Sequence, residues 1–248
     1  MGNLRSKYQG VSNIIRFNWH FFVLGLIVCF GFISLYFLLQ VSWNSWLLVV
    51  AMAIFFSIAI SLITSWYIYD FAGLYDLSWL DIKNDSPYIA NVNAGFDETT
   101  FLLRKLYPNA QVLPFDFYDK KRHTEVSIER ARARYLPLAD TIWLDSINPL
   151  LPNNKFDVVL FFMSLHEIRS KKERVKFLDT ISNGLKFDAE IIVVEHLRDW
   201  KNMLAYNIGC FHFYSRNTWQ SDFSKANLTI VHSASFTPFI RMFKLKRK

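Results

Sequence analysis

The sequence predicts an α/β fold in which two transmembrane helices precede a seven-stranded, mostly parallel sheet that ends in a C-terminal antiparallel hairpin. Three observations predict it. Residues 17–69 contain no Asp, Glu, Lys or Arg. From Tyr88 onwards, apolar strand-like runs alternate with amphipathic helical runs, which is typical of a parallel sheet covered on both faces. The chain then closes with two strand-like runs, 228–235 and 239–246, around a Thr–Pro turn.

Two apolar runs, 19–39 and 46–69, carry the membrane prediction. Each reaches the roughly 20 residues that cross a hydrocarbon core of about 30 Å, and Trp and Tyr gather at their ends. The short, uncharged connection at 40–45 indicates a hairpin; the alternative is a pair of buried core helices. Arg5, Lys7 and Arg16 precede the first span, so the positive-inside rule predicts a multi-pass cell-membrane protein with both termini and the globular domain in the cytoplasm.

Composition narrows the classes of partner. The net charge of +7 and the pI near 9.3 suit a protein that works beside anionic lipid, so the lipid bilayer is an expected partner. Nucleic-acid binding is the rival interpretation of that charge, but no nucleic-acid motif is present, so none is expected. The two cysteines, Cys29 and Cys210, are too few for a disulfide framework or a cysteine metal site, and no metal is predicted.

The predicted organisation is a transmembrane hairpin (1–70), an interfacial linker (71–87) and an α/β domain (88–248). Apolar residues among several Asp in the linker predict a short interfacial helix. Ser170 with Glu173, and Asn217 with Gln220, predict capping boxes, and Gly184 predicts a helix stop. Strands are expected at 88–92, 110–117, 141–146, 156–162 and 189–194, and helices at 97–107, 123–136, 170–185 and 217–228.

Polar residues follow the predicted strands, at the edge of the sheet where ligands bind in open parallel sheets. Asp116 ends the second strand about 20 residues after Gly95, the spacing at which a carboxylate reaches the ribose hydroxyls of a nucleoside held at the first loop. Gly95 allows close approach of the backbone, and Asp145 and Ser146 are placed to meet an adenine edge. The N-terminus of the next helix favours a ligand carboxylate.

From Tyr88 to Lys246 the chain resembles the class I S-adenosylmethionine-dependent methyltransferases, most strongly over residues 156–199 and the final hairpin. The resemblance implies a Rossmann-like domain with S-adenosylmethionine as cofactor. The family's first loop reads acid-x-Gly-x-Gly-x-Gly, whereas here only the middle glycine is kept. Asp97, at the third glycine position, brings a negative charge where the cofactor's carboxylate would lie, unless it caps the helix or binds the ammonium. The implied cofactor-binding residues are Asn91, Asn93, Gly95, Asp97, Asp116, Asp145, Ser146 and Met163.

Methyl transfer to a hydroxyl or an acidic carbon needs a positioned acceptor and a base. His166, after the fourth strand, and Glu195 and His196, at the end of the fifth, are the catalytic candidates. The alternative is that they are hydrogen-bonded scaffold residues. Glu167 and Arg169 are equally well explained as a buried structural pair.

The segment 199–215 is rich in Trp, Tyr, Phe and Met, and it predicts either core packing or an acceptor pocket open to the membrane surface. The leading hypothesis is a membrane-anchored methyltransferase acting on a lipophilic small molecule. A non-catalytic scaffold that kept the fold is the alternative, motivated by the changed first loop. A methyltransferase of protein or nucleic acid lacks a predicted basic groove, and the terminal hairpin argues against a dinucleotide oxidoreductase.

Overall fold

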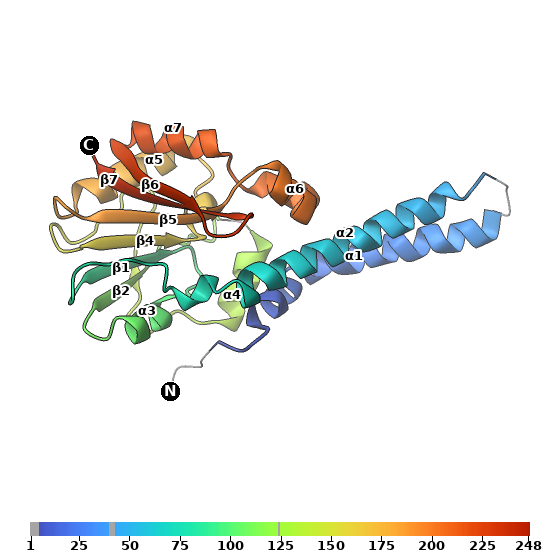
Figure 1. The fold of residues 1–248 in the computed structure, drawn as a ribbon, viewed down its shortest axis with the longest axis horizontal. Helices are drawn as coiled ribbons and strands as arrows, with labels where there is room; N and C mark the ends of the chain where they lie inside the picture. The colour runs from blue at the N-terminus through green and yellow to red at the C-terminus, as the bar shows by residue number, and fades with distance from the viewer. Residues whose placement is uncertain (1–4, 40–42, 124) are drawn as a thin grey trace.

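A long helical hairpin projects from an α/β domain in the computed structural model (Figure 1), which describes residues 5–39, 43–123 and 125–248. Its arms are α1 (Gln9–Leu39) and α2 (Trp46–Trp66), which pack side by side. Both are long and apolar enough to cross a membrane, and only 6% and 17% of their most apolar windows are buried, unlike core helices. The predicted connection at 40–45 lies partly outside the described residues.

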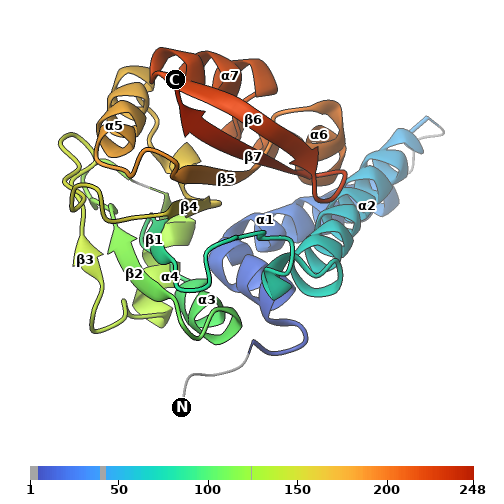
Figure 2. The same ribbon diagram turned by 60° about the vertical axis from the view of Figure 1, so that its left-hand side comes forward.

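The sheet has seven strands in the order β3-β2-β1-β4-β5-β7-β6 (Figure 2). The first five pair in parallel and β7 runs antiparallel to both β5 and β6. The predicted fold class is therefore confirmed, including its closing hairpin. The strands are β1 (Tyr88–Asn93), β2 (Gln111–Asp116), β3 (Ile142–Trp143), β4 (Val158–Phe162), β5 (Glu190–His196), β6 (Leu228–Ser235) and β7 (Ile240–Arg247).

Two apolar layers cover the sheet. One face packs against α5 and α7, through Phe177, Trp219 and Phe223 among others. The other face packs against α3 and the linker, through Leu103, Leu74 and further linker leucines. The helices of the domain are α3 (Thr100–Leu106), α4 (Val126–Arg134), α5 (Lys171–Asn183), α6 (Trp200–Tyr206) and α7 (Arg216–Lys225).

The prediction of an interfacial helix in the linker was wrong. A π-helix, η1 (Tyr67–Phe71), continues α2, and the linker then contains only a single 3-10 turn, η2 (Leu74–Asp76). Leu74, Leu77 and Leu80 are at most 4% exposed because they fill the second face of the sheet. Burying these leucines in the core removes apolar area from water, which stabilises the segment more than a shallow contact with lipid headgroups.

Two helix starts test the capping predictions. Ser170 accepts a hydrogen bond from the backbone N–H of Glu173, as the capping box predicts. The second prediction was wrong, because Ser215 rather than Asn217 caps α7 and accepts from the N–H of Thr218. The helix therefore begins two residues earlier than the Asn217 motif indicated.

The hairpin is anchored into the domain at its base. Asp70, just past α2, accepts hydrogen bonds from the N–H groups of Gly10 (2.7 Å) and Val11 (2.8 Å) and thereby caps α1. Residue 10 has to be glycine, because a Cβ there would lie 2.3 Å from Cβ of Tyr69. A kink with non-helical backbone at Asn18 separates this docked first part of α1 from the projecting part.

Candidate functional site

Asp97 caps α3, the helix that follows β1. Its Oδ1 accepts hydrogen bonds from the backbone N–H groups of Thr99 (3.0 Å) and Thr100 (2.9 Å). Asn91, at the position of the family's acid, donates through Nδ2 to Oγ1 of Thr99 and of Thr100. The changed loop is therefore an ordered strand-to-helix turn. The other carboxylate oxygen of Asp97, Oδ2, is buried and has no hydrogen-bond partner among the described residues.

Asn93 and Gly95 shape the turn itself. Gly95 has φ +96°, a backbone conformation that glycine adopts without strain, and its N–H donates to Oδ1 of Asn93 at 3.0 Å. A Cβ on Gly95 would lie 2.9 Å from Cδ of Arg132 and 3.0 Å from the ring of Tyr118. Nδ2 of Asn93 is a second buried polar atom that finds no partner in the described part of the chain.

Asp116, at the end of β2, faces this turn. Its Oδ1 accepts from the N–H of Tyr118 at 2.9 Å, and its Oδ2 forms an ion pair with the guanidinium of Arg132 on α4. Arg132 also lies over the ring of Tyr118. The cavity beside these groups is small, with a volume of about 10 Å³. Its lining residues are Asn93, Gly95, Asp97, Asp116, Tyr135, Leu136, Pro137 and Thr141.

Four predicted cofactor residues do not line this cavity. Asn91 bonds to the two threonines that start α3. Asp145 caps a turn by accepting from the N–H of Ile147. Ser146 donates to Oε1 of Glu173 at 2.5 Å. Met163 directly follows β4 and has φ 49°. The structure thus brings Asn93, Gly95 and Asp97 together with Asp116, and leaves Asn91, Asp145, Ser146 and Met163 outside.

A second polar cluster lies at the ends of β4 and β5. His166, in the 3-10 turn η3 (Leu165–Glu167), donates through Nδ1 to Oε2 of Glu195 at 2.6 Å. Its backbone N–H donates to the other oxygen of Glu195 at 3.2 Å. Glu195 is fully buried, so it fixes the orientation of the imidazole from behind. His166 and Glu195, two of the three catalytic candidates, are therefore in direct contact.

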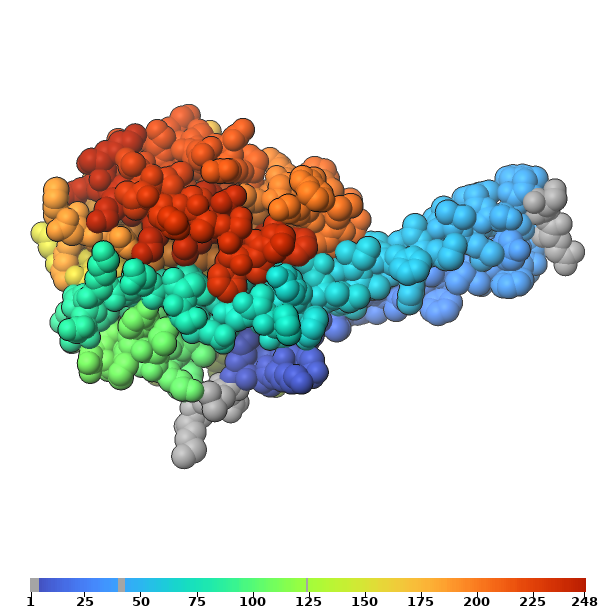
Figure 3. Space-filling model, viewed as in Figure 1, coloured from blue at the N-terminus to red at the C-terminus, as the bar shows by residue number. Residues whose placement is uncertain are grey.

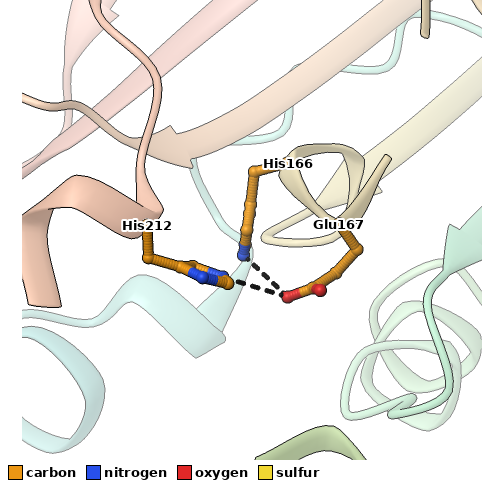
Figure 4. Close-up of side chains that lie close together, drawn as sticks. All are labelled: His166, Glu167 and His212. Atoms are coloured by element: carbon orange, nitrogen blue, oxygen red, sulfur yellow. Dashed lines mark hydrogen bonds and ion pairs between the residues drawn. The ribbon is translucent and has the colours of Figure 1, made fainter. Parts of the chain in front are cut away.

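The cluster continues through residues that the sequence did not single out as catalytic. Nε2 of His166 meets Oε1 of Glu167 at 3.1 Å, and Nε2 of His212 meets the same oxygen at 3.2 Å (Figure 4). His212 ends the 3-10 helix η4 (Asn207–His212), and its Nδ1 lies 3.1 Å from Oε1 of Glu125. Glu125 and His212 are far from His166 in the chain and follow no strand, so no sequence signal pointed to them.

The charge state of His166 follows from its neighbours. Burial lowers the pKa of the imidazole, but the carboxylates of Glu195 and Glu167 more than offset that and raise it to about 10. Burial raises the pKa of the Glu167 carboxyl, yet its hydrogen bonds to His166 and His212 hold it well below its ordinary value. At neutral pH this closed arrangement therefore holds a protonated His166 between two carboxylates.

His196, the third catalytic candidate, lies apart from that cluster. Nδ1 donates to Oδ1 of Asn202 (3.0 Å), and Nε2 then accepts from the hydroxyl of Tyr69 (2.7 Å), so both ring nitrogens have partners. The ring stacks on Phe213 with centroids 4.6 Å apart. Burial lowers its pKa to about 4, so the imidazole is neutral. These contacts join η1, the continuation of α2, to the end of β5.

Known proteins resemble this chain in fold only. No model of a known protein family matches it, and no curated protein matches it in sequence. Among solved structures, mitomycin 7-O-methyltransferase MmcR matches with a TM-score of 0.55 and 15% identity, covering 99% of this chain and 74% of that one. An O-methyltransferase family 2 protein from Planctomyces limnophilus, complexed with apigenin, matches with a TM-score of 0.52 and 14% identity. The match covers 84% of this chain and 70% of that one.

LepI in complex with S-adenosylmethionine gives a TM-score of 0.50 at 14% identity, over 70% of this chain. The chain spans less than half of LepI, 46% of its length. With the strand order already described, these likenesses show that the α/β domain has the fold of S-adenosylmethionine-dependent methyltransferases.

Proposed function

We propose that the protein is a membrane-anchored methyltransferase that moves a methyl group from S-adenosylmethionine to a lipophilic small molecule. One observation carries the proposal. In a domain of methyltransferase fold, the ends of the parallel strands hold a small cavity lined by Asp116 and a histidine–carboxylate pair of His166 and Glu195. This edge of the sheet is where ligands bind in open α/β folds.

The residues around the cavity fit the cofactor. Two buried polar atoms without partners, Nδ2 of Asn93 and Oδ2 of Asp97, line it, and they match an acceptor and an ammonium donor respectively. Asp116 supplies two acceptor oxygens for the ribose hydroxyls. The cavity volume of about 10 Å³ is far below the roughly 300–1,000 Å³ of small-molecule sites, so Arg132 has to leave Asp116 before the cofactor enters.

S-adenosylmethionine supplies an activated methyl group on a sulfonium when it is bound. His166 and Glu195 are placed to act on the acceptor. For a hydroxyl acceptor, we infer that its O–H displaces Glu167 from Nε2 of His166. That removes one of the two carboxylates that raise the pKa of the imidazole, so the ring releases its Nε2 proton to solvent more readily. The free Nε2 then accepts the proton of the acceptor's O–H as that oxygen takes the methyl group, and S-adenosylhomocysteine is left. Glu195 keeps the ring oriented throughout.

A lipophilic acceptor is supported by an apolar surface beside the spans. Trp200, Leu204, Ile208 and Phe211 recur at helical spacing along α6 and η4 and are between 61% and 80% exposed. Nδ2 of Asn207 donates to Oγ of Ser57, midway along α2, at 2.7 Å. Figure 3 shows α6, in orange, against the projecting hairpin. A bilayer around the hairpin would therefore meet this surface, next to His212 of the second cluster.

The test is methyl transfer from labelled S-adenosylmethionine to a membrane lipid extract, with full-length protein in lipid nanodiscs. The proposal expects label in the organic phase that is lost with His166→Ala and kept with His232→Ala, which changes an exposed histidine on β6. Label found only in protein, or label that is insensitive to His166→Ala, would contradict it.

A non-catalytic membrane scaffold is the second candidate, because the ion pair between Arg132 and Asp116 closes the cavity. The scaffold hypothesis expects no cofactor binding and unchanged biology for Asp116→Ala. Cofactor binding that depends on Asp116 would exclude it.

A further inference from the structure

His166, Glu167 and His212 bring three metal-binding side chains to one point. Their ligand atoms all lie within 4.8 Å of one another. Oε1 of Glu167 is 3.1 Å from Nε2 of His166 and 3.2 Å from Nε2 of His212. Around a tetrahedral Zn²⁺ with bonds of 2.0–2.1 Å, neighbouring ligand atoms lie about 3.3 Å apart. The spacing is therefore close to that of a metal site before any side chain moves.

Both histidines also have a carboxylate beside the ring nitrogen that faces away from Glu167, as metal-binding histidines usually do. A ligating imidazole almost always donates its second N–H to a carboxylate or carbonyl, which fixes the ring and its tautomer. Nδ1 of His166 donates to Glu195 at 2.6 Å, and Nδ1 of His212 lies 3.1 Å from Glu125. Nδ1 of His166 is thus held by a carboxylate, and Nδ1 of His212 lies beside one and also contacts Arg169, while Nε2 of both rings faces Glu167 (Figure 4).

An unsatisfied atom points to a missing ligand. Oε2 of Glu167 is buried and finds no hydrogen-bond partner among the described residues, although the residue is only 3% exposed. A divalent cation at this point would satisfy Oε2 of Glu167, and it would be surrounded by the carboxylates of Glu125, Glu167 and Glu195.

We propose that Nε2 of His166, Nε2 of His212 and the carboxylate of Glu167 bind one divalent transition-metal ion, with Zn²⁺ as the fitting ion. Two imidazoles and one carboxylate form a three-residue ligand set that leaves at least one coordination position open. The number of cysteines says nothing about this site, because its ligands are histidines and a glutamate. They lie far apart in the sequence, in η3 and at the end of η4.

Among the residues that the structure describes, Arg169 has to move. Its guanidinium contacts both ring nitrogens of His212 and lies 2.7 Å from Nε2, where it competes with a metal ion. Its side chain is 37% exposed, so it can turn outwards into solvent. Metal binding therefore exchanges a surface guanidinium for an ion and leaves the buried partners Glu195 and Glu167 in place.

The role of the ion rests on the proposed function, whereas its binding does not. At this position an acceptor hydroxyl would fill the open coordination site, where the metal ion lowers the pKa of the hydroxyl and favours its reactive oxyanion. With the ion bound, Nε2 of His166 is a ligand and not a base, so the proton of the hydroxyl would pass to solvent and the ion would stabilise the oxyanion that remains.

The experiment uses full-length, tag-free protein in nanodiscs, stripped with a chelator and reloaded with Zn²⁺ or Co²⁺. We expect one Zn²⁺ per chain after gel filtration. Co²⁺ should give the intense visible bands of a four- or five-coordinate site with nitrogen ligands. Glu125→Gln keeps all three ligands and should weaken binding roughly 10–100-fold, as changes to such supporting carboxylates do.

The matched variants are His212→Ala, which removes one ligand from a partly exposed position, and His232→Ala, an exposed histidine outside the cluster. The proposal requires that the first loses the metal and the second keeps it. Wild-type protein without metal, or His212→Ala that retains it, would overturn the site. Titration of the same samples with S-adenosylmethionine separates the outcomes, since cofactor binding without metal refutes only the metal site, and metal without cofactor refutes only the methyltransferase.

Discussion

The two polar regions at the ends of the parallel strands differ in how their charges are satisfied. At the first loop, the buried carboxylate of Asp116 is neutralised by Arg132, a partly exposed residue that reaches in from α4. At the second cluster, the carboxylate of Glu195 is neutralised by His166, which is itself buried. A cation on a flexible, partly exposed side chain is displaced easily, whereas a buried pair costs several kcal/mol to separate. The first region is therefore built to open, and the second to hold its geometry.

The largest effect expected is on turnover. His166→Ala should lower the rate of methyl transfer by roughly 10²–10⁴-fold, since it removes the group that receives the acceptor's proton. The affinity for S-adenosylmethionine should stay within about twofold, because the cofactor cavity does not include His166. Rates from the labelled-methyl assay and cofactor affinities from calorimetry check both parts. If the affinity for S-adenosylmethionine fell by the same factor as the rate, His166 would belong to the cofactor site, and the two regions would not have separate roles.

A second prediction concerns acid stability. The pKa of His196 is lowered to about 4 in the folded protein, so below the ordinary value of about 6.5 the unfolded chain binds a proton that the folded chain does not. Stability should fall as the pH drops from about 6.5 to about 4, by at most about 3 kcal/mol from this residue. Thermal melts across that range should show a weaker acid dependence for His196→Gln. An identical dependence of stability on pH in wild type and His196→Gln would refute the lowered pKa of His196.

The smallest expected effect concerns the ion pair at the first loop. Arg132→Ala should bind S-adenosylmethionine a few-fold more tightly, because the partly exposed ion pair that it removes is worth about 1 kcal/mol or less. Calorimetric titration of the variant beside wild type measures this. Weaker binding would mean that Arg132 turns to the cofactor's own carboxylate and helps to bind the cofactor, rather than blocking the cavity.

The sequence predicted the fold well because its signals were local. Continuous apolar runs marked β1, β4 and β5, and the absence of charge over residues 17–69 marked the hairpin. The predictions of a linker helix and of the second capping box were wrong for different physical reasons. Leu74, Leu77 and Leu80 found a sheet face to cover, which no local pattern encodes. Ser215 outcompeted Asn217 as a cap for α7.

The candidate site was predicted only where it depends on strand ends. Gly95 with Asp116, and His166 with Glu195, follow neighbouring strands, so a parallel sheet has to bring each pair to one edge. Arg132, Glu125 and His212 reach the site from α4, the loop before it and η4. Their positions depend on how these segments pack, which strand order alone does not determine. Asp145 and Ser146 follow a strand of only two residues; Asp145 caps its own turn and Ser146 bonds to Glu173 on α5.

The most direct test of the account is calorimetric titration of wild type, Asp116→Ala and Arg132→Ala in nanodiscs with S-adenosylmethionine and S-adenosylhomocysteine. Asp116 would accept hydrogen bonds from two ribose hydroxyls, each worth about 1.5–3 kcal/mol to a charged acceptor, so Asp116→Ala should weaken binding at least roughly tenfold. Arg132→Ala controls for the broken ion pair. Saturable binding that requires Asp116 is the predicted result, whereas no binding of either ligand at millimolar concentration would contradict the account.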